Sequence, residues 1–208
     1  MNFGTFAAQK PIRAAGDHPI QTVFLHDFAG VPAGVLSSAK AEAARIFLRA
    51  NVEIEWLDCS SKTDEAGKSN PCPARPPGTI MLRIVPARLD FVARAALGYA
   101  LMSEQGSVYA TISYTRMQEC TKRQTKSAAS LQQVLGHAMA HELGHILLGA
   151  EHTATGLMRA DWDASQLDDA AKGRLYFSRD EAKRIQDAVS RRMGDGAARR
   201  VPTANPAR

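Results

Sequence analysis

The stretch LQQVLGHAMAHELGHILLGAEHTATGLM, residues 131–158, decides the fold. Its first part is apolar on several sides, which predicts a buried helix that begins near Ser127 to Ser130 and ends at Leu148. Ser130 and Gln133 have the spacing of a capping box at the start of this helix. Gly149 follows Leu148 and supplies a natural C-terminal stop.

Within this helix, residues 141–145 read HELGH. His141 and His145 are four positions apart, so a helix turns both imidazoles towards one point. Glu142 projects in a different direction, where it can contact a water molecule on a metal rather than the metal itself. Burying these polar side chains among apolar neighbours without a partner would cost several kcal/mol. A bound metal removes that cost, and the pattern therefore predicts a zinc site.

A catalytic zinc ion usually has three protein ligands and one water molecule. The best candidate for the third ligand is His152, which lies seven residues beyond His145. Gly149 can end the helix and turn the chain back towards the metal.

HELGHILLGAEH followed by TGLM resembles the metzincin metallopeptidases, whose pattern is H-E-x-x-H-x-x-G-x-x-H with a downstream methionine turn. Gly149 and His152 each fall one position later than in that pattern, and the regular position holds Glu151. We favour His152 over Glu151, because widening the turn by one residue is easier than changing the ligand set. The resemblance also implies that Met158 forms the methionine turn, which supports the ligands without binding the metal.

The expected order of elements also resembles that family over roughly residues 20 to 192. Alternation, β-branched residues and breakers predict about five strands before the motif helix, one helix after the first strand with Ser37 and Ser38 as candidate caps, and a C-terminal helix from Ser178. The expected strands are Ile20–Phe28, Val52–Leu57, Thr79–Val85, Leu97–Met102 and Val108–Tyr114. The predicted fold class is α/β (α+β): a twisted mixed sheet with an N-terminal, an active-site and a C-terminal helix.

The resemblance implies a substrate-binding role for the strand that begins at Leu97. In metzincins the corresponding region is an edge strand that borders the cleft, where a peptide can add as an antiparallel strand. Leu97, Gly98, Tyr99 and Ala100 are the residues of this chain expected there.

The predicted activity is that of a zinc-dependent endopeptidase, in which a water molecule activated by zinc attacks the peptide bond and Glu142 acts as general base. Two alternatives stay open. HELGHILLG also resembles the helix of gluzincin-like peptidases, in which Glu181 would be the third ligand, although Glu181 also has capping-box spacing to Ser178. The chain could instead be an inactive binding module with a zinc-stabilised fold.

The chain has three cysteines. Cys59 and Cys72 flank a polar loop, which makes a disulfide between them possible; three unpaired thiols are the alternative. A zinc site built from cysteines is not expected, because no C-x-x-C pair occurs. The disulfide favours a secreted or periplasmic protein. No export signal is visible in the first ten residues, and a cytoplasmic location stays the alternative.

The remaining composition bounds the classes of partner. With 208 residues, the chain is expected to form one catalytic domain, 20–193, between an N-terminal extension, 1–19, and a flexible basic tail, 194–208. The excess of positive charge lies from Lys172 onward and ends in a stretch rich in Gly, Ala and Pro, which is typical of a solvated tail, so nucleic-acid binding is not expected. No stretch is long and apolar enough for a membrane span. A peptide or protein is the expected substrate, and the oligomeric state stays open.

Overall fold

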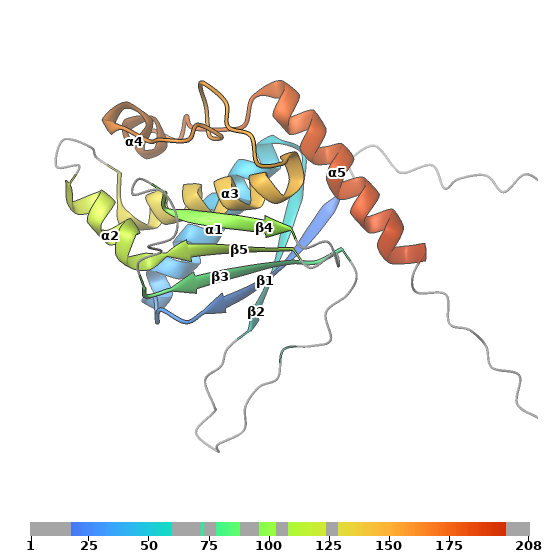
Figure 1. The fold of residues 1–208 in the computed structure, drawn as a ribbon, viewed down its shortest axis with the longest axis horizontal. Coiled ribbons are helices and arrows are strands. Elements are labelled where there is room, and N and C mark those ends of the chain that lie inside the picture. Colours follow the sequence, from blue (N-terminus) through green and yellow to red (C-terminus); the bar gives the residue numbers. More distant parts are fainter. Residues whose placement is uncertain are drawn as a thin grey trace, which may run out of the picture.

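The five strands pair into one sheet in the computed structural model, which describes residues 18–59, 72, 78–87, 96–102, 108–123 and 129–198 (Figure 1). The strands lie in the order β2-β1-β3-β5-β4. β1 is parallel to β2 and β3, β3 is parallel to β5, and β4 runs antiparallel to β5 at the edge. The strands span Ile20–Asp27 (β1), Glu53–Cys59 (β2), Ile80–Val85 (β3), Gly98–Met102 (β4) and Val108–Ser113 (β5).

Helices α1 and α3 fill one side of this sheet. The side chains of β3 alternate between buried and half-buried, and the side chains of Val23, Leu25 and Leu82 are almost fully buried in the core. The helices of the described residues are Ala33–Arg49 (α1), Tyr114–Arg123 (α2), Leu131–Leu148 (α3), Ala164–Ala171 (α4) and Arg179–Ala198 (α5). None of them is long and apolar enough to cross a membrane.

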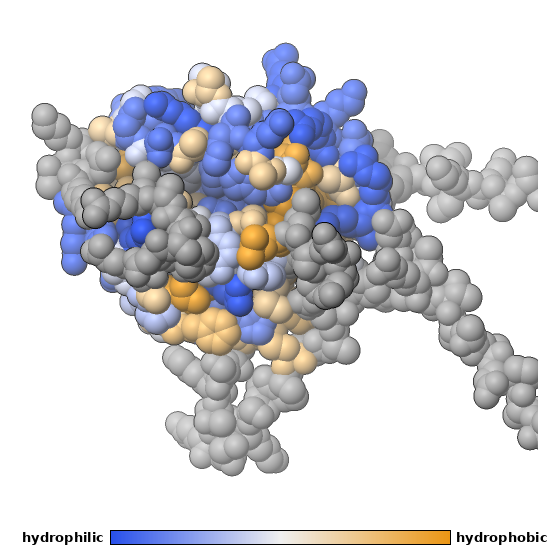
Figure 2. All heavy atoms as spheres, in the orientation of Figure 1, coloured by the Kyte–Doolittle hydropathy of each residue, from blue (hydrophilic) through white to orange (hydrophobic). Residues whose placement is uncertain are grey.

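The packing of α1 against α3 depends on a close backbone approach. A β-carbon built at Gly136 of α3 would lie 2.7 Å from the carbonyl oxygen of Ala39 and 2.7 Å from the β-carbon of Glu42. Only glycine fits this contact, so α3 can lie deep in the molecule beneath its apolar neighbours. Hydrophilic side chains gather on the outer surface over α4 and α5 (Figure 2).

The helix boundaries follow local chemistry. α3 begins at the expected capping box of Ser130 and Gln133 and ends at Gly149, whose φ is 105°. α5 begins after Ser178, whose backbone N–H donates to the carboxylate of Glu181 at 2.7 Å. The capping interactions predicted for both helices are therefore confirmed.

The predicted start of α1 is wrong. Ser37 and Ser38 lie inside the helix, which begins at Ala33 after Pro32. Proline has a fixed φ that suits a helix start, so Pro32 can begin the helix where no side-chain cap is present. The loop before it is held by Asp27, whose carboxylate accepts hydrogen bonds from the backbone N–H groups of Ala29 and Val31.

Two helices were not expected from the sequence. α2 follows β5 without a loop, and no glycine or proline between them marks the end of the strand and the start of the helix. α4 is short and begins at Asp163, whose side chain accepts from the backbone N–H of Ser165. At the other end of the chain, α5 continues to Ala198, past the expected domain end at 193. Segments 1–17 and 199–208 lie outside the described residues.

Candidate metal centre

The helix α3 carries the motif residues in buried surroundings. His141 is 8% exposed and Glu142 is 4% exposed, and the apolar residues around them belong to the main core. Buried polar groups are stable only when they have partners. The contacts of these side chains therefore indicate what the site is built to bind.

The outer nitrogens of two motif imidazoles bond to backbone carbonyl groups. Nδ1 of His141 lies 2.8 Å from the carbonyl oxygen of Leu157, and Nδ1 of His145 lies 3.0 Å from that of Gly149. A carbonyl oxygen can only accept, so Nδ1 carries the hydrogen in both rings. In a neutral imidazole, Nε2 is then the nitrogen with a free lone pair.

These two lone pairs face one another. Nε2 of His141 and Nε2 of His145 are 3.0 Å apart. Burial lowers the pKa of His141 to about 4 and also lowers the pKa of His145, so both rings are neutral at neutral pH. Two acceptors at this distance repel unless a cation binds both. Nδ1–H groups held by carbonyl oxygens are the usual support of histidines that ligate a metal.

His152 completes a group of three imidazoles. Its ring centroid lies 5.5 Å from that of His141 and 4.7 Å from that of His145. One ligand nitrogen from each of the three rings lies within 4.8 Å of the others. Because His152 is exposed, the group opens towards solvent. Three imidazoles with an open side fit a zinc ion that keeps one position for water or substrate.

Glu142 lies beside this group in a desolvated position. Burial raises the pKa of its carboxyl to about 8. Its Oε2 has no hydrogen-bond partner among the described residues. The carboxylate also lies against the backbone of β4, since a β-carbon built at Gly98 would be 2.8 Å from Oε1. An unsatisfied buried carboxyl of this kind is typical of a group that acts on a ligand.

The chain after His152 turns back beneath α3. The backbone N–H of Thr153 donates to the carbonyl of Met158 at 2.9 Å, and Gly156 has a φ of 77° that the turn requires. Met158 is 1% exposed. Its sulfur would lie 2.7 Å from a β-carbon on Gly144, so the methionine packs directly against the motif helix.

A cavity of about 830 Å³ lies over the imidazole group. Leu97, Gly98, Tyr99 and Ala100, the residues expected at the cleft edge, all line it together with His141, Glu142, His145 and His152. The structure thus brings the predicted ligands, the glutamate and the edge strand to one cavity.

Other cavity residues were missed by sequence reasoning. Trp162 packs edge-to-face on His141, with ring centroids 5.6 Å apart. Asp161 and Cys120 also line the cavity, Cys120 from the unexpected helix α2. In the sequence, Trp162 lies four residues after Met158, and this spacing matches no known motif that would have pointed to a place beside His141.

Glu181 and Glu151, the alternative third ligands, do not lie with the imidazole group. Glu181 is 4% exposed and its carboxylate accepts from the N–H of Ser178. Glu151 is exposed. Neither belongs to the groups of potential metal ligands found among the described residues. His137, one turn before His141, is fully buried and its Nδ1 lies 2.8 Å from the carbonyl oxygen of Gln133 in the same helix.

No protein-family model matches the chain, and no curated protein sequence matches it. Solved structures are similar to it. A zinc-dependent peptidase from Methanocorpusculum labreanum has a TM-score of 0.50 at 15% identity, covering 78% of this chain and 99% of that one. For metalloproteinase-II from Bacteroides fragilis the TM-score is 0.49 at 14% identity, with 85% and 55% covered. For archaemetzincin from Methanopyrus kandleri it is 0.48 at 15% identity, with 83% and 97% covered. The predicted fold class is confirmed: a mixed five-stranded sheet whose fold is that of the zinc-dependent peptidase from M. labreanum.

Proposed function

We propose that this chain is a zinc-dependent endopeptidase of metzincin-like type. His141, His145 and His152 are the proposed ligands of one zinc ion, and Glu142 is the proposed general base. The observation that carries the proposal is the 3.0 Å separation of the two Nε2 atoms, each in a ring whose Nδ1–H is held by a carbonyl oxygen. A cation bound between the rings would be stabilised by both Nε2 lone pairs and would remove the repulsion between them.

Zinc at this site would supply Lewis acidity, which polarises the substrate carbonyl and lowers the pKa of the attacking water. Glu142 accepts the proton of that water and delivers it to the leaving amine. Its burial supports this role, because desolvation raises the pKa of the carboxyl in the metal-free chain and so strengthens it as a base once the positive charge of a bound zinc ion favours its ionised form. Its unsatisfied Oε2 leaves an acceptor for the water.

The edge strand β4 is the proposed binding site for the peptide. β4 pairs with β5 on one side and has no second strand partner among the described residues, and an extended peptide can add to a strand in this position. Leu97 to Ala100 line the cavity beside Glu142. A peptide paired with this strand would pass over the imidazole group with its backbone held in an extended form.

Met158 is proposed as the residue of the methionine turn. Its side chain supports α3 at Gly144, and the preceding residue, Leu157, holds the imidazole of His141. The turn would therefore set the orientation of one ligand without contributing a metal bond of its own.

Metal content by mass spectrometry tests the ligand set. In protein that keeps the Cys59–Cys72 disulfide, we expect one zinc per chain, loss of that zinc in His152→Ala, and its retention in Glu181→Gln. The glutamine keeps an acceptor oxygen for the helix cap but would be a poor third ligand, so it is a matched control. Zinc retained in His152→Ala and lost in Glu181→Gln would replace the proposal with the gluzincin-like alternative.

Cleavage of a peptide library tests the activity. We expect cleavage by the zinc-loaded protein and none by Glu142→Gln, which should still bind zinc, because the amide cannot accept the proton. If the zinc-loaded wild type cleaves no peptide, the binding-module alternative is the better description.

A further inference from the structure

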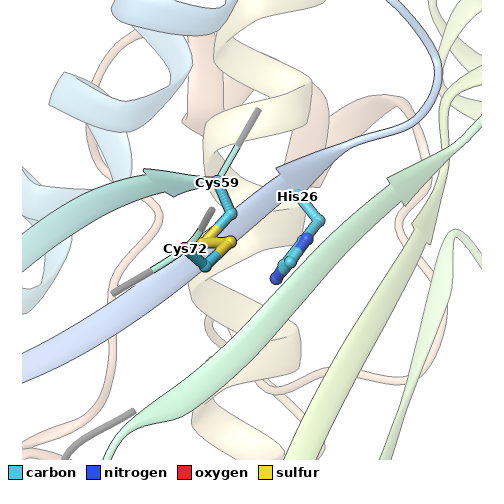
Figure 3. Close-up of side chains that lie close together, drawn as sticks. All are labelled: His26, Cys59 and Cys72. Carbon is cyan, nitrogen blue, oxygen red and sulfur yellow. A yellow bond between two sulfur atoms is a disulfide. The ribbon is translucent and has the colours of Figure 1, made fainter. Parts of the chain in front are cut away.

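A second group of metal-binding side chains lies away from the cavity. His26 at the end of β1, Cys59 at the end of β2, and Cys72 have donor atoms that all lie within 4.8 Å of one another. Cys59 and Cys72 form a disulfide in this structure. Figure 3 shows the imidazole of His26 beside the two sulfur atoms.

The sheet itself places His26 beside Cys59. The two residues are partners in the parallel register of β1 and β2, so their side chains project from the same face. Thr22 and Glu55, partners four residues earlier, also meet on this face through a hydrogen bond of 2.7 Å. Because backbone pairing fixes this neighbourhood, it persists when the disulfide is broken. Cys72 is not part of this strand pairing.

We propose that reduction of this disulfide creates a second zinc site, with His26, Cys59 and Cys72 as ligands. Two reducing thiols supply two electrons and two protons to the sulfur–sulfur bond and leave joined as their own disulfide. The two cysteine thiols then release their protons, and zinc binds the resulting thiolates together with the imidazole of His26. Disulfide and metal exclude one another, because both use the same two sulfur atoms.

The charged side chains next to this group are engaged with other partners. Asp58, next to Cys59, faces the other way and pairs with Lys40 of α1 at 2.7 Å. Arg83, the partner of His26 in β3, is drawn towards β5 by a hydrogen bond of 2.9 Å to Thr111. The guanidinium also lies over the ring of Tyr109. Its charge is therefore directed away from the cysteine pair.

The sequence argued against a zinc site containing cysteine because it lacks a C-x-x-C pair. The third proposed ligand, His26, lies in a different strand and far from both cysteines in the sequence, so no short motif contains all three residues. This proposed site is independent of the proposed peptidase function, since it shares none of the three imidazoles of the cavity.

Cobalt binding to the full-length chain tests the proposal. Thiolate ligands give cobalt a charge-transfer absorption, which a site of three imidazoles cannot give. We would use Cys120→Ser as background, because Cys120 lines the cavity. A phosphine serves as reductant, since a thiol would bind the cobalt itself. The absorption should be missing in the oxidised protein and develop with one additional cobalt per chain after reduction.

Single variants identify the ligands. His26→Ala should weaken cobalt binding at the second site by at least about tenfold. Cys59→Ser should abolish the charge-transfer band. His18→Ala, which changes a histidine outside the group, should leave both the cobalt affinity and the band unchanged. The proposal is overturned if reduction adds no cobalt, or if His26→Ala binds as tightly as its background.

Thermal unfolding gives a second readout in case reduction loosens the fold. In reduced His152→Ala, zinc should raise the unfolding midpoint, because the second site binds only the folded chain. In reduced His152→Ala with His26→Ala, the rise should be lost. No rise in the first protein would also overturn the proposal. Since His152→Ala removes a ligand of the other site, these results do not depend on the proposed function.

Discussion

Gly98 of β4 and Glu142 of α3 touch with no side chain between them. A β-carbon on Gly98 would lie 2.8 Å from Oε1 of Glu142 and 2.5 Å from the carbonyl oxygen of Thr111. Both distances are too short for a real carbon atom, so the edge strand reaches the carboxylate only because residue 98 is glycine. The strand proposed to bind substrate and the proposed general base are therefore one packed unit.

Gly98→Ala should reduce kcat/KM on the order of 10²-fold, the size of effect that a shift of about 1 Å in a catalytic group produces. The added methyl group must displace either the carboxylate of Glu142 or the backbone of β4. Zinc content should stay at the wild-type level, because the three atoms nearest this β-carbon belong to Thr111 and Glu142 and not to the imidazoles. Steady-state kinetics with metal analysis on the same samples measures both.

Gly34→Ala is the matched control for that substitution. Gly34 lies in α1, and a β-carbon there would meet no atom within 4 Å. Alanine should leave kcat/KM unchanged and stabilise the helix by up to about 1 kcal/mol. Wild-type kinetics in Gly98→Ala would mean that the contact with Glu142 has no catalytic consequence.

The sequence predicted that the imidazoles of His141 and His145 lie together, because the period of a helix places residues four apart on one face whatever the rest of the fold does. Strand positions were equally local, and all five are confirmed within one or two residues at each end. Helix α2 was missed because Ser113 of β5 and Tyr114 of α2 are adjacent, with no turn residue between them. For α4, the signal existed in the capping box of Asp163 and Gln166 but the helix has only 8 residues.

Contacts between distant segments were beyond sequence reasoning. The packing of Trp162 on His141 and the register that pairs His26 with Cys59 are set by tertiary structure. Neither has a period or spacing that a single sequence could reveal. The close approach of Gly98 to Glu142 is of the same kind, since it depends on where the edge strand lies relative to α3.

The stability of the metal-free protein should depend on Glu142 as pH rises. Its pKa is raised from 4.5 to about 8, so the folded chain retains a proton that the unfolded chain has lost in this range. Stability therefore falls as pH increases towards 8. His141, whose pKa is lowered to about 4, acts in the opposite sense, but only below its unfolded value of 6.5. Between pH 6.5 and 8 the effect of Glu142 remains.

Urea unfolding of chelator-treated wild type and Glu142→Gln at pH 6.5 and pH 8 measures this effect. Over that interval wild type should lose about 2 kcal/mol relative to the variant, at about 1.4 kcal/mol per pH unit. The comparison cancels all other titrating groups, because they are common to both proteins. Parallel stability curves would show that the carboxyl of Glu142 is not protonated in the folded metal-free chain.

Met158→Ala should lower both stability and zinc affinity. Removal of a buried methionine side chain costs about 2–5 kcal/mol in the free energy of unfolding, and Met158 is 1% exposed. The turn also includes Leu157, whose carbonyl holds Nδ1 of His141, so a relaxed turn should weaken zinc binding about 10-fold or more.

Met158→Leu separates packing from any special property of sulfur. Leucine has a similar volume and should cost less than about 1.5 kcal/mol. If packing is what matters, zinc affinity in a competition titration should stay close to wild type in Met158→Leu. A large loss of affinity in the leucine variant with normal stability would contradict the supporting role given to this turn.

Trp162 should report metal binding through its fluorescence. The chain has two tryptophans, and Trp56 lies in β2, so Trp56→Phe leaves Trp162 as the single emitter. Trp162 packs against His141 with ring centroids 5.6 Å apart. Cobalt bound at the imidazole group would therefore lie close enough to quench its emission strongly, whereas zinc, which has no electronic transitions in this range, should quench little. Quenching by cobalt should be lost with His152→Ala. Equal quenching in that variant would show that the metal does not bind at the three imidazoles. The proposed catalytic centre would then be wrong.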